Sequence, residues 1–184
     1  MTSTSTARFQ LTARWPTAAA VVVAALTVYD LAGGTALAPV LAASGLVYLG
    51  AAAAHRPAAA WPIFGATFVL ITIGKLTGTN PTVVLLAVAA LTAVVGLVHA
   101  GVHPPHAMPL QLLGMAVAGG LAAGALAVAP TVGAYLVAAG LLGHAAWDVH
   151  HHRTGRVVSR SLAEFCFVID TLLAVAIVVL TATT

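Results

Sequence analysis

The feature that most constrains this chain is a series of seven apolar stretches, each close to the length that crosses a membrane as a helix. A helix needs about 20 apolar residues to cross the hydrocarbon core of a bilayer. We expect helices over residues 16–33, 37–54, 58–77, 82–102, 108–128, 132–151 and 157–180. The links are short and carry turn residues such as Gly33-Gly34 and Thr154-Gly155. The sequence therefore predicts an all-α, polytopic bundle of seven transmembrane helices over residues 16–181, with antiparallel neighbours, after a cytoplasmic tail over residues 1–15.

The composition excludes a soluble domain and several classes of function. Of the 184 residues, 61% are hydrophobic and only 6% are charged. The links are too short to hold a soluble catalytic domain, so any chemistry belongs inside the bundle or at its rims. The single cysteine, Cys166, excludes an intramolecular disulfide. The basic residues are too dispersed for a nucleic-acid partner and are better explained as anchors beside lipid headgroups.

The first apolar stretch has a second interpretation. Arg8 and Arg14 precede it and Ala36-Leu37-Ala38 follows it, which resembles a signal peptide with a cleavage site. Pro39 directly after that site and Asp30 within the stretch argue against cleavage. We therefore expect the stretch to be retained, whereas cleavage would leave six spans.

The distribution of cations predicts the orientation of the bundle. If the seven stretches alternate, all the arginines fall on the side of the N-terminus and only Lys75 falls on the other side; the arginines are Arg8, Arg14, Arg56, Arg153, Arg156 and Arg160. The positive-inside rule then places the N-terminus in the cytoplasm and the C-terminus outside. All eight histidines fall on the same side as the arginines. We expect a multi-pass protein of the plasma (cytoplasmic) membrane with its site on the cytoplasmic side.

Seven of the eight histidines lie in two clusters, His99, His103 and His106 in one, and His144, His150, His151 and His152 in the other. Helical spacing places His144, Asp148 and His151 on one stripe with Gly140. His99 and His103 share a stripe with Thr92 and Gly96 on the helix over 82–102. Ser44, Tyr48 and His55 form a third stripe, and the last helix carries polar residues on two faces. Because polar groups avoid lipid, we expect these stripes to meet in one pocket near the cytoplasm.

Imidazole and carboxylate groups on facing helices favour a metal site. His-x-x-x-His places two imidazoles one turn apart, as in zinc-binding helices. The predicted metal ligands are His99, His103, His144, Asp148 and His151, which would hold one or two divalent ions, Zn or Fe. A metal-free hydrogen-bond network or proton relay needs the same residue types, and interfacial histidines bound to headgroups are a further alternative. His150 and His152 flank the stripe and are interpreted as rim residues.

Three carboxylates are candidate catalytic groups: Asp148, Glu164 and Asp170. Glu164 is either a base or metal ligand, or the partner of Arg160 one turn earlier. Asp170 lies near the middle of its span, where a carboxylate is protonated, paired or functional. Asp30 and Lys75 belong to the outer half, and we expect them to form a structural ion pair.

The helix over 108–128 has a surface of small residues. Gly120 and Gly124 have the Gly-x-x-x-Gly spacing, and Gly114 precedes them. This pattern predicts close helix packing inside the bundle, with a homodimer through Gly120 and Gly124 as the alternative. The other expected partners are membrane lipid and a small lipophilic substrate.

Two families resemble parts of this pattern. The helix count, orientation and site depth resemble the alkaline ceramidase and adiponectin-receptor superfamily, which implies a catalytic zinc bound by three histidines near the cytoplasm. That superfamily has its His-x-x-x-His pair on the last helix, where this chain has no histidine, so its ligand roles do not carry over. His99-x-x-x-His103 and Asp148-x-x-His151-His152 are similar to the first two histidine boxes of membrane desaturases and hydroxylases, which implies two irons. A third box is absent from the sequence.

The sequence thus predicts a membrane metalloenzyme with a cytoplasm-facing His/Asp site and a lipid or isoprenoid substrate, with hydrolysis favoured over oxidation. The competing class is a transporter or a proton or metal carrier that uses the same His, Asp and Glu residues as a relay. A relay requires a polar path from His144 through Asp170 toward Asp30 and Lys75. An enzyme requires a pocket that ends within the bundle and opens sideways to lipid.

Overall fold

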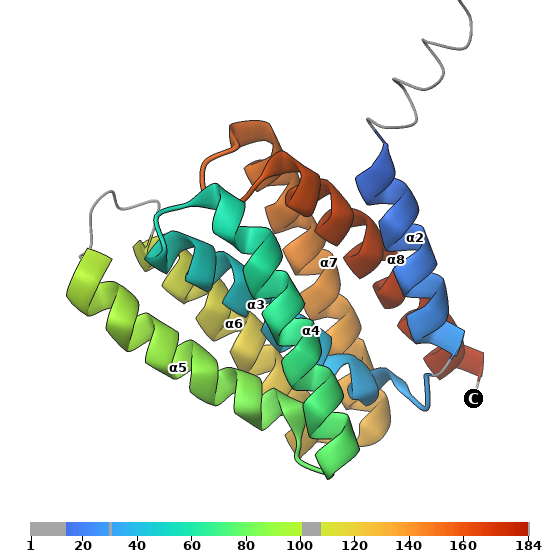
Figure 1. Ribbon diagram of the computed structural model, residues 1–184. Helices are drawn as coiled ribbons and strands as arrows, with labels where there is room; N and C mark the ends of the chain where they lie inside the picture. Colours follow the sequence, from blue (N-terminus) through green and yellow to red (C-terminus); the bar gives the residue numbers. More distant parts are fainter. Residues whose placement is uncertain (1–13, 30, 101–107, 184) are drawn as a thin grey trace, which may run out of the picture.

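The computed structural model describes residues 14–29, 31–100 and 108–183, and these residues are helical apart from short links. The elements are α2 (Trp15–Tyr29), η1 (Gly34–Leu37), α3 (Ala38–Ala53), η2 (Pro57–Ala59), α4 (Ala60–Thr77), α5 (Pro81–Ala100), α6 (Met108–Ala127), α7 (Pro130–Thr154) and α8 (Arg160–Thr183). The prediction of an all-α bundle is confirmed for the described residues. Successive long helices run in alternating directions (Figure 1).

Within the described residues, six helical segments are long and apolar enough to cross a membrane, and they begin at Gly34, Pro57, Pro81, Met108, Pro130 and Arg160. The first helix, α2, has 15 residues and is shorter than the roughly 20 that a full span needs. The count of seven spans and the orientation therefore stay predictions. Asp30 lies outside the described residues, so its pairing with Lys75, which is exposed on α4, also stays a prediction.

Some helix boundaries differ from the predicted ones for local reasons. The last helix was expected from residue 157, but Val157 and Val158 are buried in the link before it. The Ser159 hydroxyl accepts a hydrogen bond of 3.4 Å from the backbone N–H of Leu162, as the side chain before a helix commonly does. At the end of α7, Gly155 adopts the left-handed conformation with φ of 62°, which stops the helix three residues later than expected.

The helix α3 is the centre of the bundle. Fourteen of its 16 residues are buried, and it packs against α4, α5, α6 and α7. A helix that is apolar all round is buried either by neighbouring helices, as α3 is, or by lipid. The pair α7 and α8 packs beside it, and α2 lies against the outer side of α8 (Figure 1). In contrast, α4 and α5 are only 17% and 22% buried over their apolar windows, as expected for faces that contact lipid.

The small-residue surface of α6 does not pack as the sequence suggested. A Cβ atom added at Gly120 or Gly124 would meet no described atom within 4 Å, so neither glycine is needed for a helix contact within the described chain. The close approach is made instead by Gly133 near the start of α7, where a Cβ atom would collide with the backbone carbonyl oxygen of Ala125 on α6. The homodimer through Gly120 and Gly124 stays a prediction.

This difference gives a direct test of the packing. Gly133→Ala is expected to destabilise the protein by about 1–3 kcal/mol, because a backbone carbonyl cannot move aside as a flexible side chain can. Gly124→Ala, on α6, is the matched control. It is expected to leave stability unchanged or slightly higher, because the new methyl group meets no other helix and alanine favours the helical conformation more than glycine. Thermal unfolding of the detergent-solubilised variants measures both. Equal destabilisation by the two variants would contradict the described helix contact.

Candidate functional site

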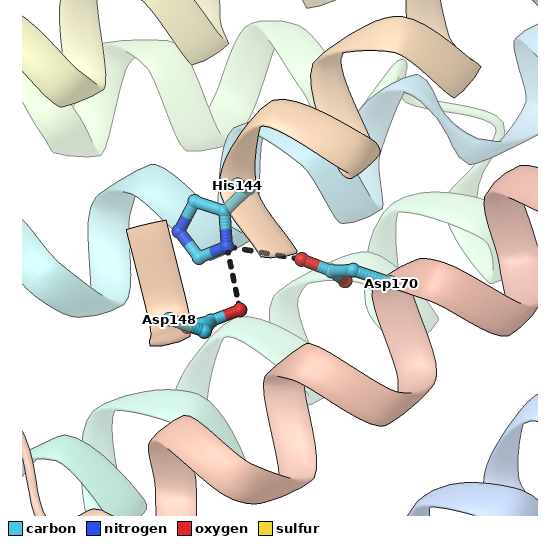
Figure 2. A group of neighbouring side chains, drawn as sticks. All are labelled: His144, Asp148 and Asp170. Carbon is cyan, nitrogen blue, oxygen red and sulfur yellow. Dashed lines mark hydrogen bonds and ion pairs between the residues drawn. The ribbon is translucent and has the colours of Figure 1, made fainter. Parts of the chain in front are cut away.

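Three side chains meet in the interior of the bundle: His144 and Asp148 on α7, and Asp170 on α8. The Nδ1 atom of His144 lies 3.0 Å from Oδ2 of Asp170 and 3.3 Å from Oδ2 of Asp148. One ligand-type atom from each residue lies within 4.8 Å of the others, which makes the group able to hold a metal ion. Figure 2 shows both carboxylates on the same side of the imidazole ring, with the other ring nitrogen pointing away from them. We call these three residues the His/Asp cluster.

Helical spacing and burial explain why these residues meet. His144 and Asp148 are four residues apart and therefore lie on one face of α7. Asp170 lies on the buried face of α8, together with Cys166, Ile169 and apolar residues further along. The close packing of α7 against α8 brings the two faces together. The His/Asp cluster is thus also a contact between α7 and α8.

A tyrosine on the central helix completes the surroundings of the cluster. The Tyr48 hydroxyl donates a hydrogen bond of 2.5 Å to Oδ1 of Asp148. The Tyr48 ring makes edge contacts with the rings of His144 and His151, at 5.1 Å and 4.9 Å between ring centroids. The tyrosine therefore fixes one oxygen of Asp148 and leaves the other oxygen facing the imidazole.

The charges of the cluster do not balance without a further positive species. Asp148 and Asp170 are 0% and 1% exposed, and the only ionisable partner that lies within ion-pair distance of them among the described residues is His144. Two buried carboxylates with one imidazole leave negative charge uncompensated if both are ionised. Burial of an unpaired charge costs several kcal/mol, so the cluster requires either an additional proton or a bound cation.

Two atoms of the cluster are also unused as hydrogen-bond partners. Oδ2 of Asp148 and Nε2 of His144 are buried and make no hydrogen bond to any described residue. Buried polar atoms in folded proteins are nearly always satisfied, so the free Oδ2 of Asp148, which lies beside Nδ1 of His144, indicates a ligand or proton position. The donor set of one imidazole and two carboxylates suits divalent ions such as Zn²⁺, Fe²⁺ or Mn²⁺.

A second polar group lies next to the cluster, nearer the end of α7. The Nδ1 atom of His151 is 3.0 Å from the Trp147 carbonyl oxygen, and its Nε2 atom is 3.2 Å from the side-chain nitrogen of Gln111. The Trp147 indole N–H donates to the Gln111 oxygen at 3.3 Å. Both ring nitrogens of His151 are therefore engaged in hydrogen bonds. The structure assigns this predicted ligand to a hydrogen-bond network beside the cluster.

The histidines of the other predicted cluster are placed differently. His99 is exposed on α5, and its Nδ1 atom lies 3.0 Å from the Val95 carbonyl oxygen on the same helix. The helix α5 packs mainly on α3, α4 and α6, away from α7 and α8. His99 is therefore not brought to the His/Asp cluster. His103 and His106 lie outside the described residues, so the metal-ligand role predicted for His103 stays a prediction.

Glu164, predicted as a catalytic group, also lies apart from the cluster. Its carboxylate accepts a hydrogen bond of 2.5 Å from the Thr17 hydroxyl on α2. It forms no ion pair with Arg160, although both residues are described. Glu164 lines a different cavity at the end of the bundle, and its hydrogen bond to Thr17 connects α8 to α2. His150 and His152 are exposed at the end of α7, where the sequence places rim residues.

A cavity of about 260 Å³ adjoins the cluster between α6 and α7. His144 and Tyr48 form part of its wall, with Gln111 and Trp147 nearby, and the remaining lining is apolar or glycine. Several lining residues are exposed on the outer surface of the bundle, including Leu113, Val117 and Gly143. The cavity therefore opens sideways onto an apolar surface, and His144 belongs to both the cavity wall and the cluster.

Along α8, the buried charged residues end at Asp170. Beyond it, the buried residues of α8 are Leu173, Ala174 and Ile177, and the facing residues of α7 are Val137 and Ala134. Within the described part of the chain, no buried charged group continues toward the end of the bundle that carries Lys75. The buried charged residues are therefore confined to one half of the described bundle, whereas Thr82, near the end that carries Lys75, is buried but uncharged.

Sequence reasoning found His144, Asp148 and Asp170 but assigned no role to Gln111. A primary amide within an apolar span was the available signal, because such a group requires a hydrogen-bond partner when it is buried. Tyr48 was placed on a polar stripe, but its direct bond to Asp148 depends on the packing of α3 against α7 and could not be read from either helix alone.

No protein-family description matches the chain, and no curated protein or solved structure is significantly similar to it.

Proposed function

We propose that this chain is an integral membrane metalloenzyme in which the His/Asp cluster binds one divalent cation and acts on a lipophilic substrate. The observation that carries the proposal is the shared position of His144. This residue lies within 3.3 Å of two buried carboxylates and also lines an apolar cavity that opens toward the lipid-facing surface. The geometry supports a substrate that enters from the membrane rather than from water.

The ligands of the cation would be Nδ1 of His144 and one oxygen each from Asp148 and Asp170. Three protein ligands leave coordination positions open, which is typical of catalytic rather than structural metal sites. A bound cation would also neutralise the two carboxylates. Zn²⁺ and Fe²⁺ both suit this donor set, and bound zinc makes the loss of a proton from water easier near neutral pH.

The cavity supports a lipid or isoprenoid as the substrate class. Its apolar walls accommodate a hydrocarbon chain, and Gln111 and Trp147 add polar groups to its lining. In the proposed reaction, water activated at the cluster hydrolyses an ester or amide of such a lipid, and Tyr48 holds Asp148 in place. All described arginines lie on links or at helix ends on the same end of the bundle as the cluster, and Lys75 lies at the other end. We therefore propose that the end with the arginines faces the cytoplasm and that the chain crosses the plasma membrane seven times.

The competing function is a relay that carries protons or metal ions across the membrane. A relay needs buried polar groups that continue through the bundle, and the buried residues of α8 beyond Asp170 are apolar. A site that ends within the bundle and opens sideways supports an enzyme over a carrier.

The proposal is tested by metal analysis of the full-length protein purified in mild detergent. We expect about one equivalent of zinc or iron per chain, because the group offers three ligands. The purified protein should release fatty acid or alcohol from a membrane lipid extract, and a chelator should stop the release. A metal-free protein that cannot be reloaded would overturn the metal assignment. A metal-loaded protein that instead moves ions across sealed vesicles would overturn the enzyme assignment.

A further inference from the structure

A second cavity, of about 430 Å³, lies at the end of the bundle between α2, α7 and α8. It is separate from the α6–α7 cavity and shares no lining residue with it. Its polar lining includes Arg14, His152 and Arg153, and its apolar lining includes Phe167 and Val168. Cations and apolar side chains thus line the same space.

The cations of this cavity are free to bind an external anion. No described carboxylate lies within ion-pair distance of Arg14 or Arg153. The only carboxylate in the lining belongs to Glu164, which accepts a hydrogen bond from the Thr17 hydroxyl, so the two arginines outnumber the single carboxylate. His152 is held in place because its Nδ1 atom lies 3.1 Å from the Arg160 carbonyl oxygen, which leaves Nε2 available. Guanidinium groups that are not paired within the protein are well suited to bind phosphate through two hydrogen bonds.

The apolar part of the lining favours a lipid over a soluble anion as the ligand of this cavity. Phe167 is 41% exposed on α8, and Val168 beside it is half-buried. Their positions, one turn beyond Glu164, extend the cavity from the cationic end along the outer surface of a helix that is apolar enough to span the membrane. A phosphate alone would use the cations and leave this surface unused, whereas a lipid would use both.

We infer that the cavity between α2, α7 and α8 is a binding site for the headgroup of an anionic phospholipid, with its phosphate at Arg14 and Arg153 and the first part of an acyl chain along Phe167 and Val168. A bound headgroup would also stabilise the position of α2 in the bundle, because it would contact Arg14 at the start of α2 and Arg153 at the end of α7. It does not depend on the His/Asp cluster, so its failure would leave the proposed function untouched.

The experiment uses the full-length protein in detergent and a phosphatidylglycerol that carries a fluorophore on one acyl chain. Binding measured by fluorescence anisotropy should be saturable, and the double variant Arg14→Gln/Arg153→Gln should weaken it by about tenfold or more. The matched control is Arg56→Gln/Arg156→Gln, which removes the same charge from links at the same end but from residues that do not line the cavity. This control should keep binding within about twofold of the unmodified protein, because charges outside the cavity are screened by salt.

Two further arms identify the chemistry of the ligand. Unlabelled phosphatidylglycerol should compete with the probe, whereas phosphatidylcholine and inorganic phosphate at millimolar concentration should compete poorly. Phe167→Ser should weaken binding of the lipid probe as well. Equal loss in the two double variants would show general attraction of cations to anionic lipid and would overturn the site. Full competition by inorganic phosphate would assign the cavity to a soluble anion and overturn the lipid assignment.

Discussion

The metal content of the purified protein is expected to fall by at least about tenfold in Asp170→Asn. Asparagine has nearly the size of aspartate and can still accept a hydrogen bond from His144, so the contact between α7 and α8 is retained. The amide lacks the negative charge that binds a divalent cation, and the cluster is left with one carboxylate and one imidazole. Inductively coupled plasma mass spectrometry on the intact, size-fractionated protein measures the change.

The control for this prediction lies on the same helix. Glu164→Gln removes the same charge from α8, but Glu164 bonds to Thr17 and lies apart from the cluster. We expect Glu164→Gln to retain the metal content of the unmodified protein. Equal loss from both variants would show that metal binding responds to the overall charge of α8 rather than to the cluster, and retention of metal in Asp170→Asn would remove this residue from the ligand set.

His99 distinguishes two sets of metal ligands: it belongs to the set predicted from sequence but not to the His/Asp cluster in the structure. The sequence placed His99 among the metal ligands, whereas the structure leaves it exposed on α5. Metal analysis of His99→Ala alongside Asp170→Asn therefore shows which set binds the metal. Loss of metal in His99→Ala alone would favour the predicted set and a different arrangement of α5.

The helices themselves were predictable because each depends on local sequence. Apolar stretches of about 20 residues, separated by glycine and proline, define the spans with errors of a few residues at their ends. The pairing of His144 with Asp148 was predictable for the same reason, since residues four apart on a helix share a face whatever surrounds it. Asp170 was predictable as protonated, paired or functional because an unpaired, ionised carboxylate in the middle of an apolar helix is costly.

The contacts between helices could not be predicted in the same way. In a bundle whose helices are mostly apolar on every side, hydrophobic periodicity does not indicate which faces meet. The sequence suggested that the stripe of His99 on α5 faces the stripe of His144 on α7, but α3 lies in the centre and α5 packs on its other neighbours. Gly120 and Gly124 of α6 failed as a packing signal for a related reason. Gly133, one helix later, is the residue whose missing side chain allows the close approach.

A second substitution tests whether a lipophilic ligand enters through the α6–α7 cavity. Gly143→Phe is expected to weaken binding of a lipophilic ligand in the α6–α7 cavity by about tenfold or more, because an aromatic ring at this position would occupy space that the ligand needs. Gly143 lines the cavity, is exposed, and has no described atom within 4 Å of where its Cβ would lie. The larger side chain can therefore be accommodated without displacing a helix. An isoprenoid alcohol with a photoreactive diazirine, displaced by the unlabelled alcohol, measures binding, and peptide mapping locates the label on α6 and α7.

The control for entry is Gly65→Phe on α4. Gly65 is also exposed and also meets no described atom within 4 Å, but it lies outside the cavity. It should leave displaceable labelling unchanged, and both variants should keep their metal, because neither touches the cluster. Loss of displaceable labelling in Gly143→Phe with retained metal would separate the route of the substrate from the site of chemistry. Undiminished labelling of α6 and α7 in Gly143→Phe would mean that the ligand reaches His144 by another path, and the sideways opening would then have no role in its entry.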